Sequence, residues 1–121
     1  MCGQIGIEHN GKVIPFSVNT TMSFVTEKGK EDFTWVNWAQ AEKFKETWAS
    51  KTVSLHKLPI SYFVEKGKKF TVKDRCVVFA RNERNQLRLL TKASGDLRKV
   101  LKHSRRPLFI RPDQELPSLY L

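Results

Sequence analysis

Short stretches of alternating apolar and polar residues recur along most of the 121-residue chain, and this period of two predicts strands. Ile5 and Ile7 alternate with polar neighbours, and Asn10-Gly11 then provides a strong signal for a two-residue hairpin turn. The returning strand contains Pro15, which has no backbone N–H to donate to a neighbouring strand. We therefore expect this strand at an edge of the sheet or at a bulge.

Six further segments have the composition and spacing of strands joined by turns. The expected pairs are 22–25 with 33–38 around a turn at 28–32, 60–64 with 70–72 around 65–69, and 76–80 with 87–91 around 81–86. Gly67 supplies the positive φ that a tight turn needs, and a last strand is expected at 108–110. Cys76 lies in an almost wholly apolar strand, so we interpret it as a buried hydrophobic residue.

Two segments have the spacing of helices. In residues 39–50, Ala41, Phe44 and Trp48 lie at i, i+3 and i+7, which places them on one helical face. A second helix is expected from Ser94, a residue suited to N-capping, to about His103. These patterns together predict the α+β class, with a mostly antiparallel β-sheet and two or three short helices.

The length and the 40% hydrophobic content suit one core, so we expect a single domain over 1–121, with 112–121 as a C-terminal tail. No apolar run has the length of a membrane span, and the N-terminus lacks the order of a signal peptide. Two distant cysteines and three histidines form no paired ligand motif. We therefore expect a cytoplasmic protein, in a bacterial or phage-infected cell, without a membrane partner, a metal or another cofactor.

The charge balance narrows the class of partner. Lys and Arg number 22 against 12 Asp and Glu, which gives a net charge of +10. The basic residues are spread along the chain and are densest at 66–69 and 99–106. This balance favours a polyanion such as nucleic acid, because neutralising phosphates releases condensed counterions. A basic surface that is simply solvated is the alternative interpretation.

Cys2 is the first candidate for chemistry, because removal of Met1 would expose its α-amine beside its thiol. In model peptides an α-amine titrates at about 7.7–8.0 and a thiol at about 8.5, so both are partly nucleophilic at neutral pH. Such a 1,2-aminothiol can condense with an aldehyde and close to a thiazolidine ring. The alternative is that Cys2 is an ordinary small buried residue.

Three further residues have chemistry beyond their packing value: Asn37 beside a helix, Glu65 at the end of an apolar strand, and His103 before two arginines. Each also has a simpler interpretation. Asn37 suits a helix entry, Glu65 suits a turn, and a cation such as His103 suits the C-terminus of a helix. Taken singly, none of them indicates a function.

In sequence order, however, these residues lie in motifs that resemble the SRAP family, the SOS-response-associated peptidase-like proteins of the DNA damage response. The similar stretches are Met1-Cys2-Gly3, Asn37-Trp38-Ala39-Gln40-Ala41-Glu42, Tyr62-Phe63-Val64-Glu65-Lys66-Gly67, Leu89-Leu90-Thr91-Lys92-Ala93 and His103-Ser104-Arg105-Arg106-Pro107-Leu108. The last is the most specific. The resemblance covers residues 1–8 and 33–111, and we interpret the chain as a short, diverged member of the kind a phage encodes.

The resemblance implies a β-barrel or open sheet, and a protein that cross-links to abasic sites in single-stranded DNA, with lyase or peptidase-like activity as related outcomes. Cys2 would be the nucleophile and Glu65 the general acid and base. Asn37 would align the Cys2 amine, and His103 would orient the sugar hydroxyl or transfer a proton. We expect the protein to act as a monomer, without a cofactor.

The resemblance also implies the DNA contacts. Arg105 and Arg106 would hold phosphates, and Trp38 could stack on an exposed base. Gln4 is the fourth expected DNA contact and stands where the family usually has an arginine; the arginine expected shortly after Asn37 is missing. We therefore expect that this chain presents DNA to its nucleophile differently from a typical member.

Two hypotheses from other classes remain open. One is a non-enzymatic basic module that binds nucleic acid or a host protein on an SRAP-like scaffold. The other is an N-terminal-nucleophile amidohydrolase, because residues 1–7 are also similar to the start of glutamine amidotransferases. That family has a much longer domain and an Arg-Gly-Pro-Asp segment, which this chain lacks.

Overall fold

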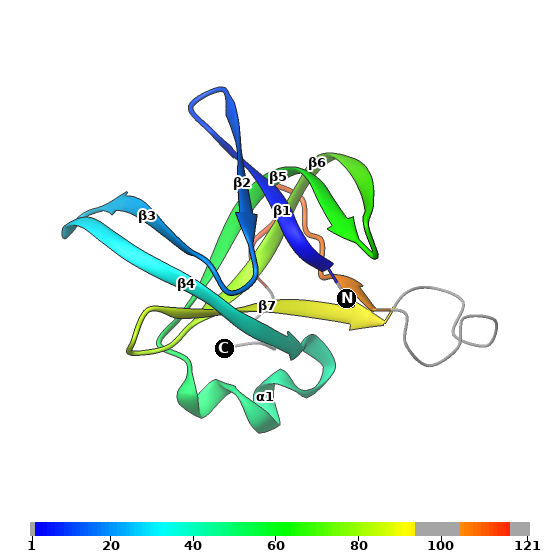
Figure 1. The fold of residues 1–121 in the computed structure, drawn as a ribbon. Helices are drawn as coiled ribbons and strands as arrows, with labels where there is room; N and C mark the ends of the chain where they lie inside the picture. Colours follow the sequence, from blue (N-terminus) through cyan, green and yellow to red (C-terminus); the bar gives the residue numbers. More distant parts are fainter. Residues whose placement is uncertain (1, 94–104, 117–121) are drawn as a thin grey trace.

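The computed structural model describes residues 2–93 and 105–116, which form one strongly curved sheet with a short helical segment (Figure 1). The strands are β1 Cys2–His9, β2 Lys12–Ser17, β3 Thr21–Thr26, β4 Gly29–Gln40, β5 Ser54–Glu65, β6 Lys68–Arg81, β7 Gln86–Ala93 and β8 Arg105–Pro107. Between β4 and β5 lie a 3-10 turn at Ala41–Lys43, helix α1 at Phe44–Thr47 and a second 3-10 turn at Ala49–Lys51.

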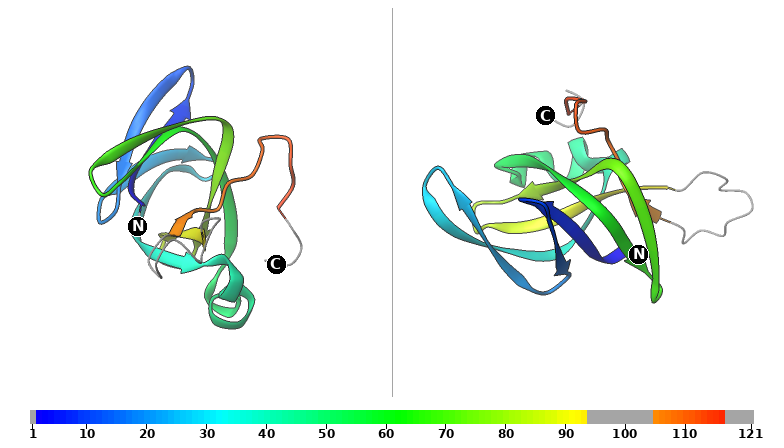
Figure 2. Two further views of the ribbon diagram at one scale, coloured as in Figure 1. Left: turned by 90° about the vertical axis from the view of Figure 1, so that its right-hand side faces the viewer. Right: turned by 90° about the horizontal axis from the view of Figure 1, so that it is seen from above.

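The sheet order is β2-β1-β5-β6-β7-β4-β3, with β8 paired to β7. Neighbouring strands are antiparallel except for β4 and β7, which are parallel. The sheet curls into a nearly closed barrel, and the two views in Figure 2 show this curvature. The predicted α+β class, mainly β, is confirmed.

The hairpins follow from local turn chemistry. Asn10 and Gly11 have φ of 51° and 75°, and Lys66 and Gly67 have φ of 50° and 76°. Positive φ at both central residues is the turn that matches the twist of two antiparallel strands, and it favours Asn and Gly. The strand with Pro15 is β2, at one end of the sheet order, as expected.

Several predicted boundaries are wrong because pairing extends the strands. The segments 70–72 and 76–80 are one strand, β6, and β4 continues to Gln40, where it pairs with Thr91 of β7. This pairing shortens the predicted helix at 39–50 to α1 and its flanking 3-10 turns. The turn predicted at 28–32 is tighter, since β4 starts at Gly29, whose φ is 99°.

The last strand is also displaced. Strand β8 is Arg105–Pro107, and within the predicted 108–110 strand Ile110 makes an isolated bridge to Cys76. The helix predicted from Ser94 to His103 lies outside the described residues. In residues 2–93 and 105–116, no helix has both the length and the apolar character to cross a bilayer.

Two cores lie on opposite faces of the sheet. The inner core fills the barrel, and its buried members are Cys2, Ile5, Ile7, Phe16, Phe33, Trp35, Ile60, Phe63, Val77, Phe79, Leu87 and Leu89. The outer core lies between the sheet and the segments α1 and 108–116; its members are Ala39, Ala41, Phe44, Cys76, Val78, Ala80, Leu90, Leu108 and Ile110. Cys76 is buried in this outer core, as predicted.

Candidate functional site

Cys2 and Glu65 are directly opposite each other in the antiparallel pair β1–β5. The next pair is Gln4 with Val64, so Gly3 is an extra residue that makes a β-bulge. The bulge places Cys2 on the same face as Ile5, inside the barrel. Glu65 follows Phe63 by two residues and therefore shares this inner face.

Opposed residues in an antiparallel pair have Cβ atoms about 4.5–5.5 Å apart, so the thiol and the carboxylate are close neighbours. They lie at one end of the barrel, which we call the Cys2 end and define by Cys2, Trp38 and Glu65. A carboxylate beside an α-amine can act as an acid and a base on it. The sequence order gave no sign that these two residues would be paired in this register.

The Cys2 thiol is fully buried, and its Sγ donates a hydrogen bond to the carbonyl oxygen of Gln4 at 3.3 Å. Burial is the main cause that raises the pKa of this thiol to about 11; the nearby charge of Glu65 also raises it, while backbone hydrogen bonds lower it. The thiol is therefore protonated at neutral pH. An exposed α-amine at Cys2 would be the stronger nucleophile of the two.

Trp38 connects β1, the strand of Cys2, to β4. Its Nε1 donates a hydrogen bond to the carbonyl oxygen of Cys2 at 2.7 Å. Trp35 packs against Trp38 with ring centroids 6.4 Å apart, and its own Nε1 donates to the carbonyl oxygen of Asn37 at 3.1 Å. Strands β1 and β4 are not neighbours in the sheet, so this hydrogen bond helps to fix the Cys2 end. Trp38 is half-buried and holds backbone, a role that the sequence did not indicate.

Asn37 is exposed, and its Oδ1 accepts a hydrogen bond from the backbone N–H of Trp38 at 2.8 Å. It pairs with Arg88 of β7, two residues before the pair Ala39 and Leu90, which belongs to the outer core. Alternation therefore places Asn37 on the outer face of β4. The structure brings Cys2 and Glu65 together on the inner face and leaves Asn37 on the opposite one.

Gln4 is also on the outer face and is bound within the protein. Its Nε2 donates to Ser17 Oγ at 2.9 Å, and its Oε1 accepts from the Tyr62 hydroxyl at 3.3 Å. The ring of Tyr62 lies on Gly6, where an added Cβ would come within 2.1 Å of it. Lys69 Nζ lies 4.3 Å from the centroid of the same ring. Only a glycine at position 6 allows this close cover of β1.

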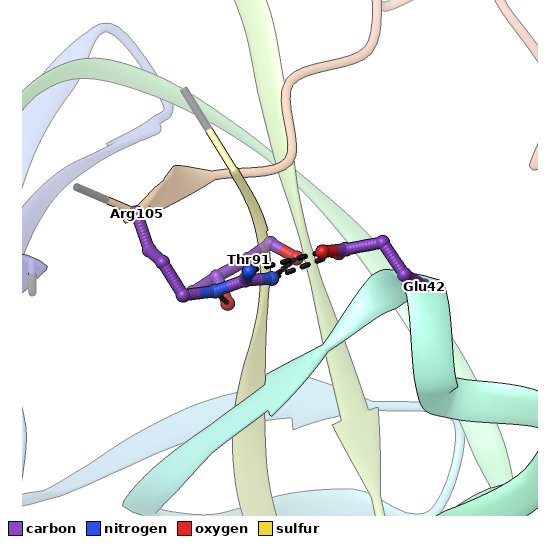
Figure 3. Close-up of polar contacts among 3 residues, drawn as sticks. All are labelled: Glu42, Thr91 and Arg105. Atoms are coloured by element: carbon purple, nitrogen blue, oxygen red, sulfur yellow. Dashed lines mark hydrogen bonds and ion pairs between the residues drawn. The ribbon is translucent and has the colours of Figure 1, made fainter. Parts of the chain in front are cut away.

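The two adjacent arginines of β8 have different surroundings. The guanidinium of Arg105 is bound by Glu42 and Thr91, as Figure 3 shows. Its Nη1 and Nη2 donate to the two carboxylate oxygens of Glu42 at 2.9 and 2.8 Å, and its Nε donates to Thr91 Oγ1 at 3.0 Å. Its Nη2 also donates to the carbonyl oxygen of Thr91 at 2.9 Å. We call this set of three residues the Arg105 clamp.

The Arg105 clamp is well shielded on the arginine side. The side chain of Arg105 is 14% exposed and that of Glu42 is 45% exposed, while Thr91 is buried. The hydrogen bond from Arg105 is the main cause that holds the pKa of the Glu42 carboxyl below its usual range. Four hydrogen bonds thus use most of the five N–H donors of Arg105.

Arg106 is exposed, and its guanidinium lies on the aromatic rings near the Cys2 end. Its central carbon is 5.3 Å from the ring centroid of Phe70 and 6.0 Å from that of Phe63. These two rings are stacked at 5.1 Å, and Phe63 precedes Glu65 by two residues on the same strand face. Contact with ring faces leaves the N–H groups free to bind an anion.

The positive charge of this region has a second source in the β5–β6 turn, where Lys66, Lys68 and Lys69 are exposed. Lys68 pairs with Glu65, so these lysines border the Cys2 end. His103, the fourth residue predicted for the site, lies outside the described residues. In the parts of the chain that the structure describes, no group of three or more His, Cys, Asp or Glu side chains could hold a metal ion.

No protein-family model, no curated protein and no solved structure matches this chain. The resemblance to the SRAP family therefore rests on the sequence motifs alone. The geometry of the Cys2 end and the charges around it are the structural features that bear on function.

Proposed function

We propose that the protein, once Met1 has been removed, binds single-stranded DNA and forms a covalent thiazolidine with abasic sites through Cys2. The observation that carries this proposal is the pairing of Cys2 with Glu65 on the inner face of one end of the barrel. The sequence motifs join these two residues only by order, whereas the register makes them neighbours. A reducing cytoplasm would keep the thiol of Cys2 free.

The chemistry needs an aldehyde, which the ring-opened deoxyribose of an abasic site provides. The Cys2 amine nitrogen attacks the aldehyde carbon, and Glu65 protonates the hydroxyl that leaves as water, which gives an imine. The thiol sulfur then bonds to the imine carbon, and the thiol proton ends on the nitrogen. One aldehyde and one aminothiol give one thiazolidine and one water, so the reaction consumes no oxidant and no cofactor.

The surroundings of Cys2 suit this order of steps. Because burial raises the pKa of the thiol to about 11, the thiol keeps its proton and the amine, a group that titrates at about 7.7–8.0 in model peptides, attacks first. Glu65 is placed to accept the proton that the attacking amine loses and to return it to the leaving hydroxyl. The same carboxylate would also assist the opening of the sugar ring.

The surrounding cations support a nucleic-acid substrate. Arg106 lies on Phe63 and Phe70 at the Cys2 end, and exposed lysines follow Glu65 in the β5–β6 turn. Phosphates on either side of an abasic sugar would meet these cations. A single strand suits the site better than a duplex, because the sugar has to approach a buried thiol.

One observation favours a second candidate, a non-enzymatic module that binds nucleic acid. Cys2 has no exposed surface, and two of the four residues that the resemblance assigns to DNA contacts, Gln4 and Arg105, are bound within the protein. Such a module would bind single strands through Arg106 and the β5–β6 turn without covalent chemistry.

The test uses purified protein whose loss of Met1 has been established by intact mass. It is incubated with a single-stranded oligonucleotide carrying one abasic site, and adducts that resist denaturation are measured by gel and mass. We expect an adduct of protein plus DNA minus one water. Cys2→Ala should form none. Cys2→Ser is the matched control, since its amine can form an imine that borohydride traps but cannot close a thiazolidine.

The outcome separates the two candidates. If Met1 is absent, the oligonucleotide binds and no adduct forms, the cross-linking proposal is wrong and the binding module is correct. If Cys2→Ser forms an adduct as stable as that of the unmodified protein without borohydride, the thiol takes no part and the thiazolidine is excluded.

A further inference from the structure

We infer that Arg105 and Arg106, although adjacent, have separate roles: Arg106 is the phosphate ligand, and the Arg105 clamp is a positioning device that keeps Arg106 at the Cys2 end. This inference rests on the proposed function for its substrate. It assigns roles to Glu42 and Thr91, which the sequence motifs do not, and it removes Arg105 from the DNA-binding surface.

Protein acceptors already bind most of the N–H donors of Arg105. A guanidinium has five N–H donors and no acceptor. Four hydrogen bonds from Arg105 already go to Glu42 and Thr91, at 2.8–3.0 Å. To bind a phosphate, Arg105 would have to give up the two-pronged contact with Glu42, a geometry in which Arg and a carboxylate fit each other especially well.

Strand β8, which carries both arginines, is very short. It has three residues, Arg105–Pro107, and pairs with β7 through three residue pairs. So short a strand has few ladder hydrogen bonds, and it needs side-chain contacts to hold its place. After β8, Leu108 N donates to the carbonyl oxygen of Leu90 at 2.9 Å, and Leu108 is buried in the outer core. The Arg105 clamp provides the corresponding anchor at the start of the strand.

Arg106 lies between these two anchors, Arg105 and Leu108. Successive residues of a strand point to opposite faces. The side chain of Arg105 reaches Glu42 and Thr91, while that of Arg106 extends over the rings of Phe63 and Phe70. Fixing Arg105 therefore fixes the backbone from which Arg106 extends. The acidic Glu42 would support DNA capture without touching DNA.

The experiment is a double-mutant cycle between Glu42 and Arg106, using the full chain without Met1. The variants are Glu42→Gln, Arg106→Ala and both together, with Thr91→Val as a second variant of the clamp and Arg105→Gln as the variant that removes the charge of Arg105. Thr91→Val matters because it loosens the clamp without changing the net charge, whereas Glu42→Gln removes a negative charge and makes the net charge one unit more positive. Circular dichroism selects a temperature at which every variant is folded.

Two quantities are measured: the rate of adduct formation, and the affinity for an unmodified oligothymidine at several salt concentrations. Arg106→Ala should lower the salt slope by about 0.7, the value for one phosphate contact of a single strand. Arg105→Gln should lower the slope by clearly less than Arg106→Ala does, because Arg105 contacts no phosphate. Glu42→Gln and Thr91→Val should each slow adduct formation about two- to tenfold, the range for one net hydrogen bond. In the Arg106→Ala background, Glu42→Gln should have no further effect.

Three results would overturn the inference: additive effects of Glu42→Gln and Arg106→Ala, normal adduct formation by both Glu42→Gln and Thr91→Val, or a fall in salt slope for Arg105→Gln equal to that for Arg106→Ala. If the unmodified protein forms no adduct, the proposed function fails. The same cycle can then be read from the oligothymidine affinities, so the division between the two arginines is tested separately.

Discussion

The two ends of the barrel differ in chemistry although the same strands build both. At the Cys2 end a thiol, a carboxylate and an exposed guanidinium lie near one another. The opposite end holds a cavity of about 140 Å³, lined by Phe24, Thr26, Phe33, His56, Leu58, Phe79 and Leu87. Apart from Thr26 and His56, this lining is apolar. We call it the Leu58 end.

Residues that stabilise the barrel and residues suited to chemistry can therefore lie at opposite ends of the same strands. Strand β5 contributes to both ends: its Leu58 lines the apolar cavity, and its last residue, Glu65, faces Cys2. Substitutions near Leu58 should act on the free energy of unfolding, and substitutions near Glu65 should act on reaction rates. Substitutions of Glu65 and Leu87 test this separation directly, whereas substitutions of Gly6 and Glu42 test the packing of β1 and the Arg105 clamp.

The largest effect is expected for Glu65→Gln. Loss of a positioned acid and base should slow adduct formation about 10²- to 10⁴-fold, since this is the usual contribution of general acid–base catalysis. The rate is measured with abasic single-stranded DNA in single-turnover conditions. Glu8→Gln is the matched control: it removes one carboxylate from β1, where Glu8 accepts a hydrogen bond from Ser61. Equal slowing by both variants would show that Glu65 contributes only its charge.

Leu87→Ala should test the opposite end. Leu87 is 3% exposed and lines the cavity, so its truncation should lower the free energy of unfolding by about 2–5 kcal/mol. Urea unfolding measures this change. At a temperature where the variant stays folded, adduct formation should proceed at the normal rate. A rate that fell in parallel with stability would break the separation between the two ends.

Gly6→Ala should have a smaller effect, on the strand that carries Cys2. The new Cβ would lie 2.1 Å from the Tyr62 ring, so the ring has to move, and we expect a loss of about 1–3 kcal/mol. Gly3→Ala is the matched control in the same strand, because its Cβ would meet its nearest neighbour, Val18, at an ordinary 3.9 Å. Thermal unfolding compares the two variants. Equal losses would contradict the close packing of Tyr62 on Gly6.

The smallest effect concerns pH. Since Arg105 lowers the pKa of Glu42 in the folded state, the clamp adds stability above the ordinary carboxyl value of 4.5 and loses it as the pH falls through the lowered value. Glu42 is partly exposed, so the contribution should be below about 1 kcal/mol. Melting temperatures from pH 3 to 6 should fall less steeply with acid for Glu42→Gln. An unchanged acid limb would mean that the ion pair adds no stability.

Much of the local structure could be predicted from the sequence. Asn10, Gly11 and Gly67 have the positive φ that their residue types favour, and Pro15 lies in an edge strand because it lacks a donor. Cys76 is buried, as its apolar neighbours indicated. The helical spacing at 39–50 was misleading, because pairing of β4 with β7 draws the first two residues of that segment into the sheet.

The sequence motifs indicate candidate residues for the site but do not indicate how those residues are arranged in space. Cys2 and Glu65 were selected from motif order, and the register then places them opposite each other. Asn37 was selected on the same grounds, yet the pairing of β4 with β7 turns it to the outer face. Trp38, expected to stack on a base, holds the carbonyl of Cys2 instead of lying free.

The sequence alone therefore predicts most of the turns, the mainly β class and the net positive charge, and it singles out Cys2 as the candidate nucleophile that removal of Met1 would expose. Only the tertiary structure decided which side chains share a face. The physical reason is that side chains alternate along a strand, so a single extra residue, such as Gly3 in β1, reverses the face of what precedes it. The same alternation separates Arg105 from Arg106: two identical side chains, one residue apart, meet a carboxylate on one face and aromatic rings on the other.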